Sequence, residues 1–432
     1  MKRTTRTIGL SLGADLCWPQ FYEDILAELA PTARIGDEIV DFAVERVTIE
    51  PFDLAQPVRY EMVLDRLTPW YHTSREWIKK AVVMDDLYVL NSPFTLQAMQ
   101  KHTSYAAMMR LGVPVPETWL LPPKEYARTD PLEADLDVTL GRYAQMFDLK
   151  ALGERLGYPL FMKPYDGGAW IGVSRIEDGD ALEAAYDQSG SRIMHLQKAV
   201  HPFDLFVRCL AVGPQVHVIR YDPDAPLHDR YKVDFHFVDG AEWDQLVDLT
   251  LTINTFFGWD FNSCEALRKD GVFHPIDFAN ANPDSQVTSL HYHLPWLVKA
   301  LLRWSLFAAA TRRRMRHDLG WREFVEIADS HEDYGDRLRA LGQLASRRLD
   351  ADAFEEFCAA SLGELDEIAY EYFGTNRARD IVRRKVTTVF PDHEVERFTD
   401  HFYGLIEFWR KTERDRLDSV AAAKGDTEGG AT

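Results

Sequence analysis

The chain lacks the excess of basic residues with which nucleic-acid-binding proteins hold phosphates. Its 432 residues include 49 Lys and Arg against 69 Asp and Glu, which gives a formal net charge of -20 at pH 7. Because a face that binds DNA or RNA is basic, this balance argues against a nucleic-acid partner. The same acidity disfavours adhesion to anionic membranes.

Cysteine is scarce, and so are long apolar runs. The four cysteines, Cys17, Cys209, Cys264 and Cys358, are far apart and form no CxxC pair. Neither a zinc site nor a disulfide framework is predicted, and a reduced, cytoplasmic setting fits. No stretch approaches the roughly twenty apolar residues of a membrane span. The short apolar run at the N-terminus is broken by glycine, which is poor for a signal peptide.

What is present has the composition of an ordinary globular protein, with 46% hydrophobic and 27% charged residues. Alternating strand-like and helix-like segments predict an open α/β domain at residues 1–92, with a helix at 18–29 and strands at 46–49 and 88–90. A central α/β domain follows at 93–290, with a lid at about 150–200, a core at about 201–290 and a hairpin that turns at Gly213-Pro214. Long amphipathic stretches, among them a helix at 352–373, predict an all-helical C-terminal domain at 291–420, and residues 421–432 are expected to be disordered.

The most informative stretch is residues 158–175, YPLFMKPYDGGAWIGVSR. Residues 160–162 predict a buried strand, and Lys163 at its end is a charge that needs a partner. The glycines that follow, which let backbone N–H groups approach an anion, are Gly167, Gly168 and Gly172. Because no Gly-Lys-Ser/Thr follows, this is not a P-loop. The stretch indicates a phosphate-binding loop, with a plain surface turn as the alternative.

Acidic and amide side chains gather late in the central domain. Glu265 lies in one strand of a predicted hairpin, Asp277 ends the partner strand, and Asn280 follows. Oxygen ligands on adjacent strands suit Mg2+ or Mn2+. Lysines that could face the phosphates of a nucleotide occur in four separate elements, namely Lys101, Lys163, Lys198 and Lys232. Together these groups predict a site for a triphosphate and its metal, although a solvated surface charge is the alternative for each lysine except Lys163.

In this order the residues resemble the ATP-grasp superfamily, over roughly residues 60–290. Lys101 is followed by LGVPVPET at 111–118, which is similar to the family's phrase G-hydrophobic-P-x-P-x-T. Lys163 with its glycines looks like the family's strand lysine and lid. The segment HLQKAV at 195–200 looks like the hinge strand that holds adenine. The resemblance therefore implies an α/β fold of the ATP-grasp type, with a preceding α/β domain.

The resemblance also implies roles for individual residues. The implied ATP-binding residues are Lys101, Lys163, Gly167, Gly168, Gln197, Lys198, Val200 and Asp204. The implied metal ligands are Glu265, Asp277 and Asn280. Lys163 and Lys232 would stabilise the transferred phosphoryl group. Arg220 and Arg268 are our choice among Arg208, Arg220, Arg230 and Arg268 for holding a substrate carboxylate.

The chain departs from the family pattern at three places. Gln197 stands where the hinge usually has glutamate, and Ala169-Trp170 stand where the lid usually has small hydroxyl residues. Asp277 and Asn280 are three residues apart, where the family usually has glutamate and asparagine two apart. A bulge in the strand would restore the geometry of the metal site.

The implied activity is an ATP-dependent ligase. A small-molecule carboxylate would be activated to an acyl phosphate and attacked by an amine or a thiol. Two alternatives stay open, a small-molecule kinase on the same fold and a non-catalytic nucleotide-binding module with a protein partner. The helical domain would be a packing accessory or an oligomer interface, for instance of a homodimer. His291 and His293 would be general bases at the acceptor site or core residues.

Overall fold

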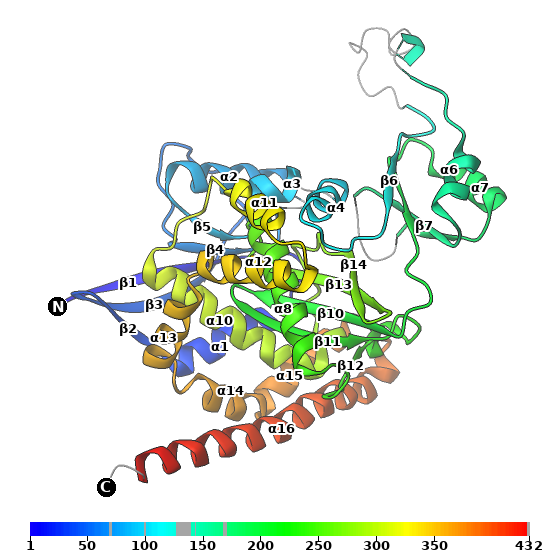
Figure 1. Cartoon of the computed structure of the whole chain (residues 1–432). Coiled ribbons are helices and arrows are strands. Elements are labelled where there is room, and N and C mark those ends of the chain that lie inside the picture. The colour runs from blue at the N-terminus through cyan, green and yellow to red at the C-terminus, as the bar shows by residue number, and fades with distance from the viewer. Residues whose placement is uncertain (69–70, 99–100, 127–139, 143, 167–170, 430–432) are drawn as a thin grey trace.

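The computed structural model describes residues 1–68, 71–98, 101–126, 140–142, 144–166 and 171–429. The predicted lid residues Gly167 and Gly168, with Ala169 and Trp170, lie outside these ranges. The strands within them form three sheets, and helices pack on each of the three (Figure 1). No described helix combines the length and the apolar character needed to cross a membrane.

The N-terminal sheet has the order β2-β3-β1-β4-β5. Its strands are β1 (Lys2–Ser11), β2 (Thr32–Ile35), β3 (Glu38–Arg46), β4 (Met62–Asp65) and β5 (Tyr88–Leu90). All pairs are parallel except β2 with β3. Helices α1 (Trp18–Leu29) and α10 (Leu294–Thr311) cover one face, and α2 (His72–Met84) covers the other. The predicted open α/β arrangement is confirmed, but the strand predicted at 46–49 is wrong because β3 ends at Arg46.

A second, smaller sheet projects from the body of the molecule at the upper right of Figure 1. Its order is β6-β9-β7-β8. The strands are β6 (Thr118–Leu121), β7 (Leu160–Pro164), β8 (Ser174–Ile176) and β9 (Met194–Lys198). Helices α6 (Leu149–Leu156) and α7 (Gly179–Ser189) pack on one face through a separate hydrophobic core. The other face carries Lys163 and Gln197, since β7 and β9 pair Lys163 with His195 and Phe161 with Gln197.

The third sheet is antiparallel, with the order β12-β11-β10-β13-β14. Its strands are β10 (Leu205–Val212), β11 (Gln215–Tyr221), β12 (Tyr231–Lys232), β13 (Phe261–Lys269) and β14 (Val272–Asp277). The predicted hairpin around Gly213 is confirmed, and no larger residue fits there. Gly213 has φ +57°, and a Cβ atom would lie 2.3 Å from the Trp304 ring. Helix α8 (Gly240–Phe257), which begins with a capping box from Asp239 and Glu242, covers one face of this sheet.

The C-terminal region is helical, as predicted. After α9 (Val287–Leu290) and α10 come α11 (Trp321–Ser330), α12 (Tyr334–Arg348), α13 (Ala351–Ser361), α14 (Leu365–Phe373), α15 (Asn376–Thr387) and α16 (Val395–Gly429). Helix α10 shares one hydrophobic core with the N-terminal sheet and with the face of the third sheet opposite α8. The helical region is therefore built into the body of the molecule. Helix α16 reaches Gly429, into the segment for which composition predicts disorder.

Candidate functional site

The site begins with a bulge in β14. Glu265 on β13 lies opposite Asp277, but the next pair joins Ala266 to Pro275, so Ile276 is an extra residue on β14. Because side chains alternate along a strand, one extra residue changes which face the following side chain occupies. This bulge precedes Asp277, so the three-residue spacing from Asp277 to Asn280 remains as the sequence has it. The bulge places the carboxylates of Glu265 and Asp277 on neighbouring strands at the same level.

The carbonyl group of Ile276 binds two side chains from other parts of the fold. It accepts a hydrogen bond from Lys163 Nζ at 2.9 Å and from Tyr105 Oη at 2.9 Å. Lys163 also donates to Gln197 Oε1 at 2.9 Å and lies 5.1 Å from the centre of the Tyr105 ring. Tyr105 belongs to α4 (Lys101–Arg110), and Lys163 to β7. These contacts hold the small sheet and α4 against the end of β14.

Two further cations stand beside the carboxylates. Lys101, at the start of α4, donates to Asp277 Oδ2 at 2.7 Å. Arg208 on β10 lies in register with Glu265, and its Nη1 atom is 3.4 Å from Glu265 Oε1. Asn280 Nδ2 donates to the Ser263 carbonyl at 3.4 Å. Asp277 Oδ1 is buried and accepts no hydrogen bond from the described residues.

The pKa values of these groups reflect burial and mutual charge. Burial lowers the pKa of Lys163 to about 8, with Lys101 acting in the same direction and Asp277 opposing it. Burial raises the pKa of Glu265, against the effect of Arg208. Burial would also raise the pKa of Asp277, but Lys101 and Lys163 leave it lowered. Three cations therefore surround two carboxylates, which leaves a positive site suited to a polyanion.

The residues present fit a divalent cation that prefers oxygen. In the described residues no group of three or more His, Cys, Asp and Glu is placed to hold a metal ion. Glu265 and Asp277, with the amide of Asn280, are a smaller oxygen set of the kind that Mg2+ or Mn2+ accepts when phosphate and water supply the other ligands. The buried, unpartnered Oδ1 atom of Asp277 is an acceptor that such an ion would satisfy.

Three predicted catalytic cations lie elsewhere. Arg220 lies opposite Val207 on one side and opposite Lys232 on the other, so all three side chains occupy the same face of the sheet. Val207 packs in the core under α8, and this face is therefore the one opposite Glu265. Arg268 is an odd number of residues from Glu265 and so also points to that face. Each has a carboxylate partner: Asp234 for Arg220 at 2.7 Å, Asp229 for Lys232 at 2.8 Å, and Asp204 and Glu242 for Arg268 at 2.7 and 2.6 Å.

The predicted hinge residues are only partly gathered at the site. Gln197 is buried, and its Nε2 atom donates to Thr118 Oγ1 at 2.7 Å. Lys198, the next residue, is exposed, and Val200 is half-buried. Asp204, predicted to bind ribose, is bound by Arg268 in this structure. The structure thus brings together Lys101, Lys163, Gln197, Glu265, Asp277 and Asn280.

Sequence reasoning missed three contributors. Arg208 was weighed but not chosen, although alternation along β10 and β13 puts it beside Glu265. Tyr105 is four residues after Lys101 and so shares its face of α4. His195 is fully buried beside Lys163, with no hydrogen-bond partner for either ring nitrogen among the described residues. Burial, reinforced by Lys163, lowers its pKa to about 3, so this imidazole is neutral. Its position two residues before Gln197 was the available signal.

Comparisons with known proteins were made by family model, by sequence and by structure. No family model matches the chain. A D-alanine--D-alanine ligase of Burkholderia pseudomallei is 28% identical over 80 residues, which is 18% of this chain and 26% of the ligase. A ligase of the same name from Burkholderia mallei is 29% identical over 77 residues, 17% of this chain and 25% of the ligase. The chain therefore spans about a quarter of the length of these curated relatives.

Solved structures resemble larger parts of the chain at lower identity. An ATP-grasp RimK domain protein of Sphaerobacter thermophilus is 14% identical, covers 69% of this chain and 99% of its own, and has a TM-score of 0.44. A D-alanine--D-alanine ligase of Bacillus anthracis complexed with ATP is 15% identical, covers 71% and 99%, and has a TM-score of 0.45. Structural likeness at this level leaves the activity to be argued from the chain's own residues. The curated matches show that a stretch of about 80 residues of this chain is similar to D-alanine--D-alanine ligases.

Proposed function

We propose that the chain is an ATP-dependent ligase of the ATP-grasp type, which joins a small-molecule carboxylate to an amine or a thiol through an acyl phosphate. The observation that carries the proposal is the pairing of Glu265 with Asp277 across the bulge, beside Lys101 and Lys163. Carboxylates for a metal and cations for phosphates, held within one buried cluster, are what phosphoryl transfer requires.

Lys163 is the residue best prepared to bind a phosphate. In the described residues its hydrogen-bond partners are both neutral, the side-chain amide of Gln197 and the carbonyl of Ile276. A buried ammonium group with neutral partners gains most from an anionic one, because burial makes its own charge costly. A phosphate oxygen would supply that charge and would raise the depressed pKa of Lys163.

Lys101 and Arg208 would serve the two ends of the metal site. Lys101 holds Asp277 through Oδ2 and leaves Oδ1 for a ligand. Arg208 offsets the charge of Glu265, so two carboxylates can stay ionised close together. Glu265, Asp277 and Asn280 would hold Mg2+ or Mn2+, which when bound neutralises phosphate charge. The hinge strand at 195–200 would bind adenine, mainly through its backbone.

The reaction needs protection from water, because an acyl phosphate hydrolyses readily. Lys163 is already buried, and the carboxylates of Glu265 and Asp277 are partly buried, with 14% and 22% of their side chains exposed. Gly167 and Gly168 would close the site further, as their resemblance to the family lid implies. The role predicted for Arg268 at the substrate is tested by Arg268→Met, and the roles of Arg220 and Lys232 stay predictions.

The experiment is to measure phosphate and ADP released from Mg-ATP with a panel of small carboxylates, each with and without mixed amines. We expect phosphate release to need both substrates and to be lost in Lys163→Ala and Glu265→Ala. Arg268→Met and Arg208→Met form a matched pair of variants that tests which arginine acts at the site. We expect only Arg208→Met to reduce turnover strongly.

Two outcomes would contradict the ligase. ADP release without free phosphate, dependent on a polyol rather than on an amine, would indicate a kinase. If the unmodified chain binds ATP but turns over no mixture of substrates, and if Glu265→Ala still binds ATP, the chain would be a nucleotide-binding module.

A further inference from the structure

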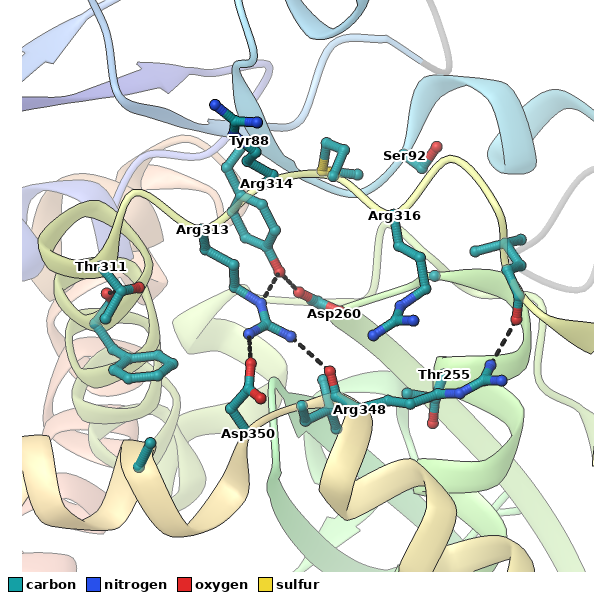
Figure 2. Close-up of a pocket in the computed structure, with 16 residues that line it drawn as sticks. Tyr88, Ser92, Thr255, Asp260, Thr311, Arg313, Arg314, Arg316, Arg348 and Asp350 are labelled. Carbon is teal, nitrogen blue, oxygen red and sulfur yellow. Dashed lines mark hydrogen bonds and ion pairs between the residues drawn. The ribbon is translucent and has the colours of Figure 1, made fainter. Parts of the chain in front are cut away.

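A second site lies away from the carboxylate cluster, where the N-terminal sheet, β13 and the helical region meet. There the structure encloses a cavity of about 510 Å³ (Figure 2). Tyr88 and Ser92 line it from the N-terminal domain, Asp260 from the start of β13, and Arg348 from the end of α12. The connection from α10 to α11 contributes three arginines, Arg313, Arg314 and Arg316. A cavity of this size accommodates a small metabolite.

The charges of the lining residues are unusual for an acidic chain. Four arginines line the cavity against two carboxylates, those of Asp260 and Asp350. Asp260 is half-buried and accepts hydrogen bonds from Tyr88 Oη and from Trp304 Nε1. Because the chain as a whole carries a formal charge of -20, a concentration of guanidinium groups in one concave place needs an explanation.

Three of the four arginines are committed to partners within the chain. Arg313 donates to Asp350, to Tyr88 Oη at 3.2 Å and to the Arg348 carbonyl at 2.8 Å. Arg348 donates to the Leu319 carbonyl and pairs with Glu323 at 2.7 Å. Arg314 lies 3.3 Å from Asp86. Arg313 and Arg348 are thus held in the cavity wall, whereas Arg314 is exposed.

Arg316 differs from them. It makes no hydrogen bond or ion pair with any residue that the structure describes. Figure 2 shows its guanidinium group reaching into the cavity between Arg313 and Arg348. Partial burial lowers its pKa, Arg348 and Arg313 add to this effect, and Asp350 and Glu323 oppose it. A guanidinium group has five N–H donors in a planar fork, and here all five are available to a ligand.

We propose that this cavity binds a small phosphate-bearing molecule, with Arg316 as its principal contact and the hydroxyl group of Ser92 as a second donor. A guanidinium group binds phosphate through two parallel hydrogen bonds, which favours phosphate over a simple halide. The site is separate from the proposed nucleotide site. Asp260 and Glu265 are five residues apart along β13, which corresponds to about 16 Å.

The test is a calorimetric titration of the full chain with inorganic phosphate, and then with glucose 6-phosphate against glucose, at constant ionic strength. Arg316→Met removes the free guanidinium, and Arg312→Met is the matched control, since Arg312 is exposed on the same connection and does not line the cavity. Because Arg316 has no partner in the described chain, its loss leaves the fold intact. Lys163→Ala reports binding at the proposed nucleotide site.

We expect phosphate and glucose 6-phosphate to bind the unmodified chain and Arg312→Met alike and to keep one binding site in Lys163→Ala, and glucose to bind none of these proteins. In Arg316→Met the dissociation constant should rise at least about tenfold. Binding that is lost in Lys163→Ala but kept in Arg316→Met would place the phosphate at the nucleotide site and overturn the proposal. Absence of binding to the unmodified chain would overturn it as well.

Discussion

Two buried clusters of charged residues invite comparison, the candidate site and the contact between α10 and α16. In the second cluster, Lys299 on α10 donates to Glu413 Oε1 at 2.5 Å and lies 3.1 Å from Asp366. Arg416 bonds both carboxylates as well, and Arg303 adds a further bond to Asp366. In the candidate site, by contrast, Asp277 Oδ1 lacks a partner among the described residues, and the hydrogen-bond partners of Lys163 are neutral.

The difference separates structural charge from charge kept for a ligand. Burial would raise the pKa of Asp366, but Lys299 and Arg303 reverse the effect and leave it lowered, so this cluster is satisfied by its own chain. The pKa of Lys163 is lowered as well, but for a lysine a lowered pKa favours the neutral form. A satisfied buried cluster stabilises the fold once formed, whereas an unsatisfied one is costly until a ligand completes it.

The largest expected effect follows from removing the unsatisfied cation. Lys163→Ala should reduce ATP-dependent phosphate release by about a thousandfold, as loss of a preorganised charge at a transition state does. Thermal unfolding should change less than in Lys299→Met, because among the described residues Lys163 makes hydrogen bonds to neutral groups and no ion pair. A variant that unfolds readily but retains turnover would reverse the comparison.

The satisfied cluster should respond in the opposite way. Lys299→Met leaves Glu413 and Asp366 with one cation fewer, and we expect a loss of about 3 kcal/mol in the free energy of unfolding. Turnover at low temperature should be unchanged. Urea unfolding of Lys299→Met beside Lys411→Met, an exposed lysine on α16, measures the difference. Equal stability of the two variants would contradict the assignment.

Acid should destabilise the fold through two buried histidines, His291 and His293, which lie just before α10. Burial lowers the pKa of His291 to about 3 and of His293 to about 4, against about 6.5 in an unfolded chain. Above pH 6.5 both imidazoles are neutral in the folded and in the unfolded chain, so they do not make the stability depend on pH. Below pH 6.5 the unfolded state binds more protons, so each imidazole destabilises the fold by up to about 1.4 kcal/mol per pH unit until its folded pKa is reached. Urea unfolding at several pH values checks this.

The matched variant for the acid effect is His291→Asn, which should flatten the pH dependence between 6.5 and 4 in the same titration. His72→Gln, at an exposed histidine of α2, should leave the dependence unchanged. An identical slope in all three proteins would assign the acid sensitivity to other groups.

The smallest expected effect concerns the pH profile of the site. Lys163 must be protonated to hold a phosphate, and its pKa is about 8, so affinity for ATP should fall as pH rises above 8. Gln197→Glu would place an opposite charge where the amide now accepts from Lys163, and should move this alkaline limb upward by about one pH unit. Nucleotide titrations between pH 7 and 10 measure the shift. A profile unchanged by the substitution would mean that another group sets it.

The elements of the fold were predictable where local pattern decides them. The helix at 18–29 and the strand at 88–90 have the predicted bounds, because apolar spacing and flanking turn residues specify them. The predicted single helix at 352–373 is wrong, since the chain breaks at Leu362 between α13 and α14. Helix α12 was missed because its arginine-rich sequence hides a stripe of buried leucines and alanine.

The members of the candidate site were predictable where the residue type and its place in a local element are enough to identify them. Lys101, Lys163, Glu265 and Asp277 were named from sequence and lie together. The choice of Arg268 over Arg208 depended on register across two strands, and register comes from long-range pairing that a single sequence does not display. Partner choice was equally hidden, as the pairing of Asp204 with Arg268 illustrates.

The bulge at Ile276 has an evolutionary consequence. Ile276 contributes its carbonyl oxygen to Lys163 and Tyr105, and a carbonyl is supplied by every amino acid. The position can therefore change its side chain over generations at little cost. Loss of a single codon there would instead rotate Asp277 away from Glu265 while every other residue of the strand stayed the same. At this position, natural variation is constrained in the length of the segment more than in its composition.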